Sequence, residues 1–218
     1  MASGAGCLIN GMCVTQEQPT VLLTGFGLFR DYKNNSSKEV VSELSRVGIP
    51  GVRIVTAELP VEYEAVSKTV PELWEKHRPL LAVHCGMNAK ADALTLEKVA
   101  NNGGYGSVDN AGACPEGGLC TVECASDLLL CTRLDVDAVC KRLQEDKLDV
   151  PVKVSEDAGR FLCEFIYFTS LKINQSTVFV HVPPLDEPFS IQQLARALGA
   201  IVRALLEQLG CKLTNVAI

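Results

Sequence analysis

Short apolar runs alternate with amphipathic segments along most of the chain. Residues 20–28 (TVLLTGFGL) are almost uniformly apolar and close on glycines, which is typical of a strand buried on both faces. Residues 36–47 then place apolar side chains at helical spacing, which predicts a helix. The same two patterns predict further strands at 52–59, 80–85, 150–154 and 176–182, and further helices at 63–77, 135–147, 161–171 and 190–209.

This alternation predicts one α/β domain with a mostly parallel sheet and helices on both faces, a three-layer sandwich. No internal repeat and no linker rich in Pro, Gly or Ser divides the chain. We expect residues 1–19 to form a disordered N-terminal segment, residues 20–211 the domain, and residues 212–218 a C-terminal tail. In such sheets, functional sites lie at the carboxyl ends of the strands.

Composition narrows the possible partners. The 218 residues include 20 Lys and Arg against 26 Asp and Glu, a formal net charge of -6, which argues against a nucleic-acid partner. The first twenty residues carry no Lys or Arg and only short apolar pieces, so no secretory signal is expected. No apolar run approaches the roughly 18 residues of a membrane span, so we expect no membrane partner and a cytoplasmic location.

The chain has ten cysteines, and in a reducing compartment these are thiols, metal ligands or a nucleophile rather than disulfides. The densest group is Cys114, Cys120, Cys124 and Cys131, but its gaps are irregular and it contains no CxxC pair. A zinc module there stays open as a minor alternative to ordinary reduced cysteines.

Three histidines leave few candidates for proton transfer near neutral pH. His77 ends a predicted helix, where it is more simply interpreted as a surface cation. His84 lies inside an apolar strand, where it is more simply interpreted as a core histidine. His181 lies two residues before the pair Pro183–Pro184, near the carboxyl end of its strand, so a functional role and a structural one remain equally open.

Cys163 and Glu97 complete the candidate chemistry. Cys163 follows the turn EDAGR and falls in the first turn of a predicted helix, whose dipole and free N–H groups favour a thiolate and can receive an oxyanion. The alternative is a buried packing cysteine. Glu97 is either a solvated charge or the carboxylate that orients a histidine.

Phe26 and Phe29 follow the first strand and either pack or form the wall of a small apolar pocket. The glycines there do not match a nucleotide-binding fingerprint.

Seven sequence blocks, in order along the chain, carry a resemblance. They are TGFG-L-F at 24–29, ELPVEY at 58–63, LWEKH at 73–77, TLEK at 95–98, GY-x-x-x-DN at 104–110, DAGRFLC at 157–163 and FVHVPPL at 179–185. From about residue 21 to about residue 209 the chain resembles the pyroglutamyl-peptidase I family (peptidase family C15), and most closely its vertebrate I-like branch. The resemblance implies an α/β sandwich with a twisted central sheet and no metal or cofactor.

The resemblance also implies a cysteine peptidase that removes N-terminal pyroglutamate from peptides, the expected partners. The catalytic Glu, Cys and His of the family fall on Glu97, Cys163 and His181. The lactam pocket maps to Phe26, Phe29, Val108, Phe161 and Leu162.

Five positions depart from the family pattern: Leu28, Arg30, Lys38, Met87 and Ser107. None is a member of the catalytic set, but several are expected at the mouth of the pocket. The alternative function is therefore a catalytically weak or inactive paralogue that acts as a peptide- or protein-binding module. The sequence leaves the oligomeric state undetermined.

Overall fold

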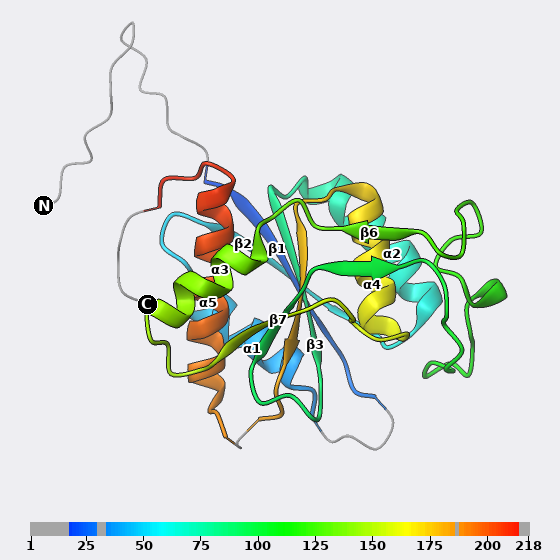
Figure 1. Cartoon of the computed structure of the whole chain (residues 1–218), viewed down its shortest axis with the longest axis horizontal. Helices are drawn as coiled ribbons and strands as arrows, with labels where there is room; N and C mark the ends of the chain where they lie inside the picture. The colour runs from blue at the N-terminus through cyan, green and yellow to red at the C-terminus, as the bar shows by residue number, and fades with distance from the viewer. Residues whose placement is uncertain (1–17, 30–33, 186–187, 214–218) are drawn as a thin grey trace, which may run out of the picture.

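A computed structural model describes residues 18–213 of the chain, apart from residues 30–33 and 186–187 (Figure 1). The strands are β1 (Thr20–Phe26), β2 (Arg53–Leu59), β3 (Leu81–Met87), β4 (Leu94–Glu97), β5 (Val99–Asn101), β6 (Leu129–Cys131), β7 (Val152–Ser155) and β8 (Thr177–Val182). The α-helices are α1 (Ser36–Val47), α2 (Tyr63–His77), α3 (Val136–Glu145), α4 (Leu162–Ile173) and α5 (Ile191–Gln208), and a short 3₁₀ helix covers Glu116–Gly118.

Six strands form the central sheet in the order β2-β1-β3-β8-β4-β7. The first four run parallel to one another, so β1, β3 and β8 end at the same edge of the sheet. Strand β4 pairs antiparallel with β8, and β7 pairs parallel with β4, so these two run in the opposite direction. The sheet is therefore mostly parallel, as the sequence predicts, with a reversed pair at one side. Strands β5 and β6 form a separate antiparallel ribbon.

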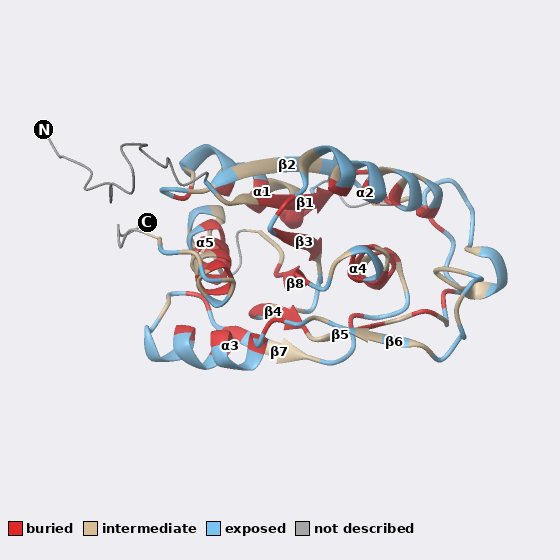
Figure 2. Ribbon diagram, turned by 90° about the horizontal axis from the view of Figure 1, so that it is seen from above, coloured by how far each residue is buried: buried red, intermediate tan, exposed pale blue. Residues whose placement is uncertain are grey.

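Helices cover both faces of the central sheet (Figure 2). Helices α1, α3 and α5 pack on one face over an almost entirely aliphatic core. Helices α2 and α4 pack on the other face, where the core contains the buried aromatic side chains. The three-layer arrangement follows from strands that are apolar on both sides, because each such face has to be covered.

Local capping fixes where several helices begin. The Asn35 side chain accepts a hydrogen bond from the backbone N–H of Ser37 at the start of α1, and Asp135 caps α3 in the same way. Ser190 and Gln193 form a capping box at α5. Such caps satisfy N–H groups that have no partner inside the helix.

The strands and helices predicted from hydrophobic spacing are present, mostly within two residues of the expected ends. Three short strands, β4, β5 and β6, were not predicted as strands. Each spans only three or four residues, too few for an alternating pattern to stand out. The expected disorder of residues 1–19 falls almost wholly outside the described residues, and so does most of the tail at 212–218.

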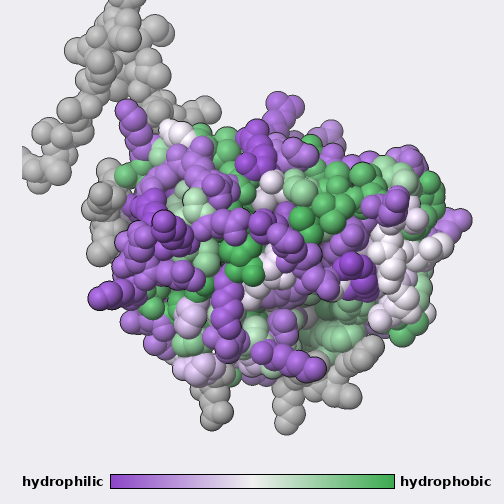
Figure 3. All heavy atoms as spheres, in the orientation of Figure 1, coloured by the Kyte–Doolittle hydropathy of each residue, from purple (hydrophilic) through white to green (hydrophobic). Residues whose placement is uncertain are grey.

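The exterior is polar over much of the view in Figure 3, with an apolar patch where Figure 1 places β6 and the end of α4. Exposed Leu129 and Ile173 belong to these two elements. Among the described residues, none of the helices is both long enough and apolar enough to cross a bilayer.

His84 is an ionisable group in the middle of the sheet. It is fully buried in β3, with Nδ1 2.8 Å from the Thr24 hydroxyl. Burial lowers the pKa of His84 to about 3, so the folded protein keeps this imidazole neutral. In the unfolded chain, a histidine takes up a proton below about pH 6.5. The folded state therefore loses stability as the pH falls below that value, and the loss continues toward pH 3.

We predict that His84→Gln flattens the pH dependence of stability on the acid side. The free energy of unfolding of the wild-type protein should include a contribution from His84 that falls by about 1.4 kcal/mol per pH unit well below pH 6.5. Urea unfolding at pH 5, 6 and 7 measures this slope. His77→Gln, at the end of α2, is the matched control and should leave the slope unchanged. Equal slopes for wild type and His84→Gln would contradict the prediction.

Candidate active site

A buried histidine–carboxylate pair links two antiparallel strands. His181 on β8 and Glu97 on β4 are two register positions apart, because Thr95 pairs with His181 and Glu97 with Phe179. Their side chains lie on the same face of the sheet, and His181 Nδ1 is 2.7 Å from Glu97 Oε1. His181 is 7% exposed and Glu97 is 1% exposed. The carboxylate therefore fixes the orientation of the ring and leaves Nε2 available to another group.

Cys163 is brought to this pair by α4, in which it is the second residue. Its Sγ lies over Gly86 of β3, where a Cβ on Gly86 would come within 2.7 Å of the sulfur and of Phe179 Cζ. Gly86 and His181 are direct partners in the β3–β8 register. The absence of a side chain at Gly86 therefore lets the thiol sit against the sheet beside the histidine.

Cys163 and Glu97 together set the charge on His181. Burial disfavours the imidazolium, but hydrogen bonding and charge from Cys163, followed by the same contributions from Glu97, outweigh it and raise the pKa of His181 to about 10. A raised pKa means that the imidazolium persists through neutral pH. The arrangement is that of an imidazolium between the Cys163 sulfur and the Glu97 carboxylate.

The start of α4 also supplies hydrogen-bond donors. The backbone N–H groups of Leu162, Cys163 and Glu164 precede the first intrahelical bond, which runs from Phe165 N to Phe161 O. No side chain caps this helix. Free N–H groups at a helix N-terminus, together with the helix dipole, can hold an anion that develops beside the sulfur.

A cavity of about 180 Å³ opens beside the thiol. Its lining residues are mostly apolar and are Phe26, Phe29, Asn35, Val61, Met87, Ala89, Phe161, Leu162 and Cys163. The rings of Phe29 and Phe161 lie 5.1 Å apart between their centroids. The Asn35 amide is already engaged, donating to Gly27 O and accepting from Ser37. The cavity therefore suits a small, uncharged group.

The structure brings most of the residues singled out in the sequence to this cavity. Phe26, Phe29, Phe161 and Leu162 line it with Cys163. Val108 does not, and it is 50% exposed. Its neighbours make the inward contacts instead, since Ser107 O accepts from Tyr63 Oη and Asp109 accepts from Tyr63 N.

Three further lining residues, Asn35, Val61 and Ala89, were not singled out for the cavity in the sequence, and a fourth, Met87, was named there only among the departures, several of which were expected at the mouth of the pocket. A signal was available for Met87, because it ends a buried strand directly after a glycine, at the edge where the parallel strands finish.

Among the departures from the family pattern, Met87 lines the cavity. Leu28 is 56% exposed, and its carbonyl accepts from Asn110. The Lys38 side chain pairs with Glu58 at 3.0 Å. Arg30 lies outside the described residues. Of the departures that the structure describes, Met87 alone contributes to the cavity wall.

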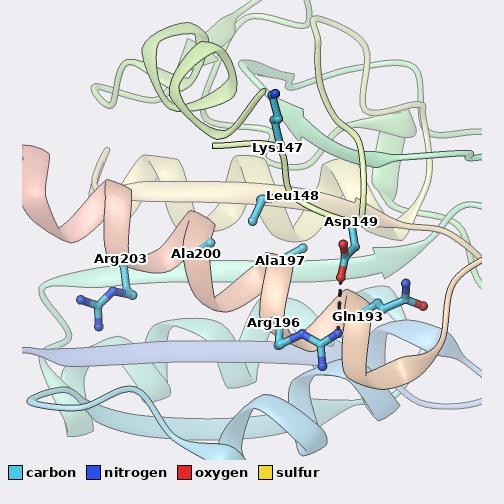
Figure 4. A pocket seen from close by; sticks show the side chains of 8 residues that line it. All are labelled: Lys147, Leu148, Asp149, Gln193, Arg196, Ala197, Ala200 and Arg203. Carbon is cyan, nitrogen blue, oxygen red and sulfur yellow. Dashed lines mark ion pairs between the residues drawn. The ribbon is translucent and has the colours of Figure 1, made fainter. Parts of the chain in front are cut away.

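A larger cavity of about 350 Å³ lies beside α5, away from the thiol. Figure 4 shows its cationic side chains spread apart: Lys147 extends away from α5, and Arg203 points in a different direction from Arg196. Arg196 is paired with Asp149 at 3.6 Å. Because these groups do not converge on one point, this cavity is a weaker candidate than the smaller one at Cys163.

The zinc alternative finds no support in the part of the chain that the structure describes. There, no group of three or more His, Cys, Asp or Glu side chains is placed to hold a metal ion. Cys114, Cys120, Cys124 and Cys131 are all free thiols. Cys7 and Cys13 lie outside the described residues.

Comparisons with known proteins agree on one family. A family model described as pyroglutamyl peptidase matches residues 19–204. The human pyroglutamyl-peptidase 1 is 45% identical over 197 residues, covering 88% of this chain and 93% of its own length. The human pyroglutamyl-peptidase 1-like protein is 38% identical over 172 residues, covering 77% and 86%. Both vertebrate branches are thus among the relatives.

Solved structures show the same fold. Pyrrolidone carboxyl peptidase from Thermococcus litoralis superposes with a TM-score of 0.79 at 20% identity, covering 92% of this chain and all of that one. The Bacillus amyloliquefaciens pyroglutamyl peptidase I gives a TM-score of 0.73 at 24% identity, covering 84% and 94%.

We predict that Gly86→Ala disturbs the site through Cys163. The new methyl group would lie 2.7 Å from both Sγ and the Phe179 ring, so the thiol has to move or α4 has to shift. Overpacking of this kind costs about 1–3 kcal/mol. Thermal unfolding and the rate of Cys163 alkylation, followed by mass spectrometry, measure the two effects.

The matched control for Gly86→Ala is Gly106→Ala, because a Cβ on Gly106 meets nothing within 4 Å. It should change stability by less than about 0.5 kcal/mol and leave alkylation of Cys163 unaltered. Equal behaviour of the two variants would show that the contact at Gly86 does not position the thiol.

Proposed function

This chain belongs to the pyroglutamyl peptidase family, and from that membership we propose that it removes N-terminal pyroglutamate from peptides, with Cys163 as nucleophile, His181 as acid and base, and Glu97 as the group that orients His181. The assembly of these three side chains beside a small apolar cavity carries the proposal.

Acylation begins from the thiolate–imidazolium pair. The Cys163 sulfur attacks the carbonyl carbon of the pyroglutamyl residue, and the carbonyl oxygen becomes an oxyanion that accepts from the backbone N–H of Cys163 and its neighbours in the first turn. The C–N bond then breaks. His181 gives its proton to the departing amine, and a thioester joins Cys163 to pyroglutamate.

Deacylation reverses the roles. Neutral His181 takes a proton from water, and the resulting hydroxide attacks the thioester carbonyl. The C–S bond breaks and free pyroglutamate leaves, which restores the thiolate and the imidazolium. Glu97, held 2.7 Å from Nδ1, stabilises the charged ring in both half-reactions.

The cavity accounts for the preference for a lactam. Its wall is largely Phe, Val, Leu and Met, and its one polar side chain, Asn35, already has partners. The flat ring of pyroglutamate carries no charge, so it gives up less hydration on entering the cavity than a charged group would. A free N-terminal ammonium would have to give up its hydration in a largely apolar cavity, where the Cys163 thiolate is already paired with His181, which is unfavourable.

The alternative of a binding module without catalysis is not favoured by the comparisons, because the relatives that are 45% identical and the similar solved structures are named as peptidases. An intact catalytic set speaks for turnover, because a binding module needs neither a paired thiol nor a buried carboxylate behind a histidine.

We predict that the purified protein hydrolyses pyroglutamyl-aminomethylcoumarin and that Cys163→Ser lowers kcat by at least about 10³-fold, because a hydroxyl does not ionise in this setting. Fluorescence release measures the rate. Cys124→Ser, which replaces a cysteine away from the cavity, is the control and should retain wild-type activity. A well-folded wild-type protein with no turnover would leave the binding module as the better account.

We predict that Glu97→Gln lowers kcat by about 10²–10⁴-fold and moves the alkaline limb of the pH profile to lower pH. The carboxylate helps raise the pKa of His181, so its loss lets the imidazolium lose its proton at a lower pH. A pH series of kcat/KM measures the limb. Glu75→Gln, on the exposed side of α2, is the control. An unmoved alkaline limb would show that Glu97 does not set the charge of His181.

A further inference from the structure

The residue that follows the nucleophile carries a carboxylate with no part in the mechanism above. Glu164 is the third residue of α4, and its side chain is 0% exposed. Burying a charge is costly unless the charge is paired and hydrogen-bonded. Because Glu164 follows Cys163 directly in the chain, an uncompensated negative charge on it would also disfavour a thiolate at Cys163.

Two residues supply the partners of this carboxylate. Arg160 Nη1 donates to both Glu164 oxygens, at 3.0 and 2.9 Å. The backbone N–H and the side-chain Nδ2 of Asn101 donate to Oε1 at 3.1 and 2.9 Å. Burial raises the pKa of Glu164, and the bonds from Asn101 and the charge of Arg160 oppose that rise. The carboxylate is therefore held by one cation and two N–H donors.

Arg160 ties three segments together. It belongs to the loop that leads into α4, where it also pairs with Asp157 at 2.8 Å. Its stem crosses Gly104, where a Cβ would lie 3.1 Å from Arg160 Cδ. Gly104 has a φ of +100°, so a side chain at that position would be strained as well as crowded. The loop before the nucleophile is thus bound both to α4 and to the segment after β5.

Asn101 links the Glu164 carboxylate to β5 and to the segment that follows it. It is the last residue of β5, and its carbonyl accepts from Tyr105 Oη at 2.6 Å. The Tyr105 ring packs edge-on against Phe165 of α4, with centroids 5.5 Å apart. The first turn of α4 is therefore clamped between two surfaces: the sheet at Gly86, and the β5 segment through Glu164.

We propose that Glu164 and Arg160 form a positioning pair for the proposed cysteine peptidase reaction: Glu164 holds the first turn of α4, with its thiol and N–H donors, against the substrate carbonyl, and Arg160 cancels the charge that Glu164 would otherwise exert on the thiolate. The inference rests on the function proposed above. Neither residue touches the cavity, so both act through Cys163 and its neighbours.

The test uses Glu164→Gln in the full-length protein, which keeps an oxygen acceptor for Asn101 but removes the negative charge. We expect kcat to fall by about 10–100-fold with KM within about threefold, because a small displacement of the nucleophile affects the transition state more than binding. Removing the charge also leaves Arg160 with the exposed Asp157 as its remaining carboxylate partner, so the acid limb of kcat/KM should move down by about half a pH unit or more.

A second readout separates this inference from the proposed function. Iodoacetamide alkylation of Cys163, followed by mass spectrometry of its peptide, reports the thiolate without any turnover. Its pH dependence should shift down in Glu164→Gln even if the protein cleaves no pyroglutamyl substrate. Glu43→Gln removes the carboxylate of the Arg46 pair on α1 and serves as the matched control, with no shift expected.

Replacing Arg160 should shift the pH dependence of Cys163 alkylation in the opposite direction. Arg160→Met leaves the carboxylate without its cation, so the alkylation limb should move to higher pH, and this variant carries the test where Glu164→Gln does not fold. Asp157→Asn removes the more exposed partner of Arg160 and should change kcat by less than about threefold. The contrary result would be variants that lower the melting temperature while leaving both the acid limb of kcat/KM and the pH dependence of alkylation unchanged. That result would assign the pair a purely structural role and overturn the proposal.

Discussion

The close approach of α4 to the sheet at Gly86 is the constraint on which the rest of the site depends. A helix packed on a sheet normally stands off by the thickness of the side chains between them. Here one strand residue has no side chain, and the sulfur of Cys163 occupies the space. Because Gly86 is the register partner of His181, the same contact fixes both the height of the thiol above the sheet and its position beside His181. The cavity follows, since Phe161 and Leu162 precede Cys163 in the chain and are carried into place with it.

The placement of Glu97 beside His181 depends on a second feature, the reversed direction of strand β4. In a wholly parallel sheet, the neighbour of β8 would present its own carboxyl end at this edge, and a loop would follow. Strand β4 instead runs antiparallel, so Glu97 arises from within the sheet, two register positions from the partner of His181. Its backbone is held as well, because Glu97 O accepts from Tyr167 of α4 at 2.8 Å. The carboxylate therefore has little freedom to leave the imidazole, as the proposed orienting role of Glu97 requires.

The sequence predicts the layers well because long apolar runs and helical spacing are strong signals. Residues 20–28 and 190–209 show this, since their apolar patterns correspond to β1 and α5. The direction of β4 left no such signal, because four residues carry no information on pairing. The catalytic candidates could be chosen from residue type and position, whereas Val108 could not be placed, since a loop residue points inward or outward according to which neighbours form hydrogen bonds. Glu164 was passed over because burial of an acid cannot be read from its immediate neighbours in the sequence.

The two faces of the central sheet bury different kinds of side chain. Under α1, α3 and α5 the core is aliphatic, and its side chains have shapes that pack without polar partners. Among the described residues, the buried histidines and acids, namely His84, Glu97, Asp109, Glu164 and His181, belong instead to the side covered by α2, α4 and the loop that follows β5. Each of them needs specific partners to be buried at all, so this face has little freedom to repack. The side covered by α1, α3 and α5 can accept substitutions that conserve volume. The buried ionisable groups on the other side cannot be exchanged in this way, because moving one of them leaves its partner without a hydrogen bond. The hydrogen bonds and ion pairs that allow these ionisable groups to be buried are therefore also the interactions that fix their positions.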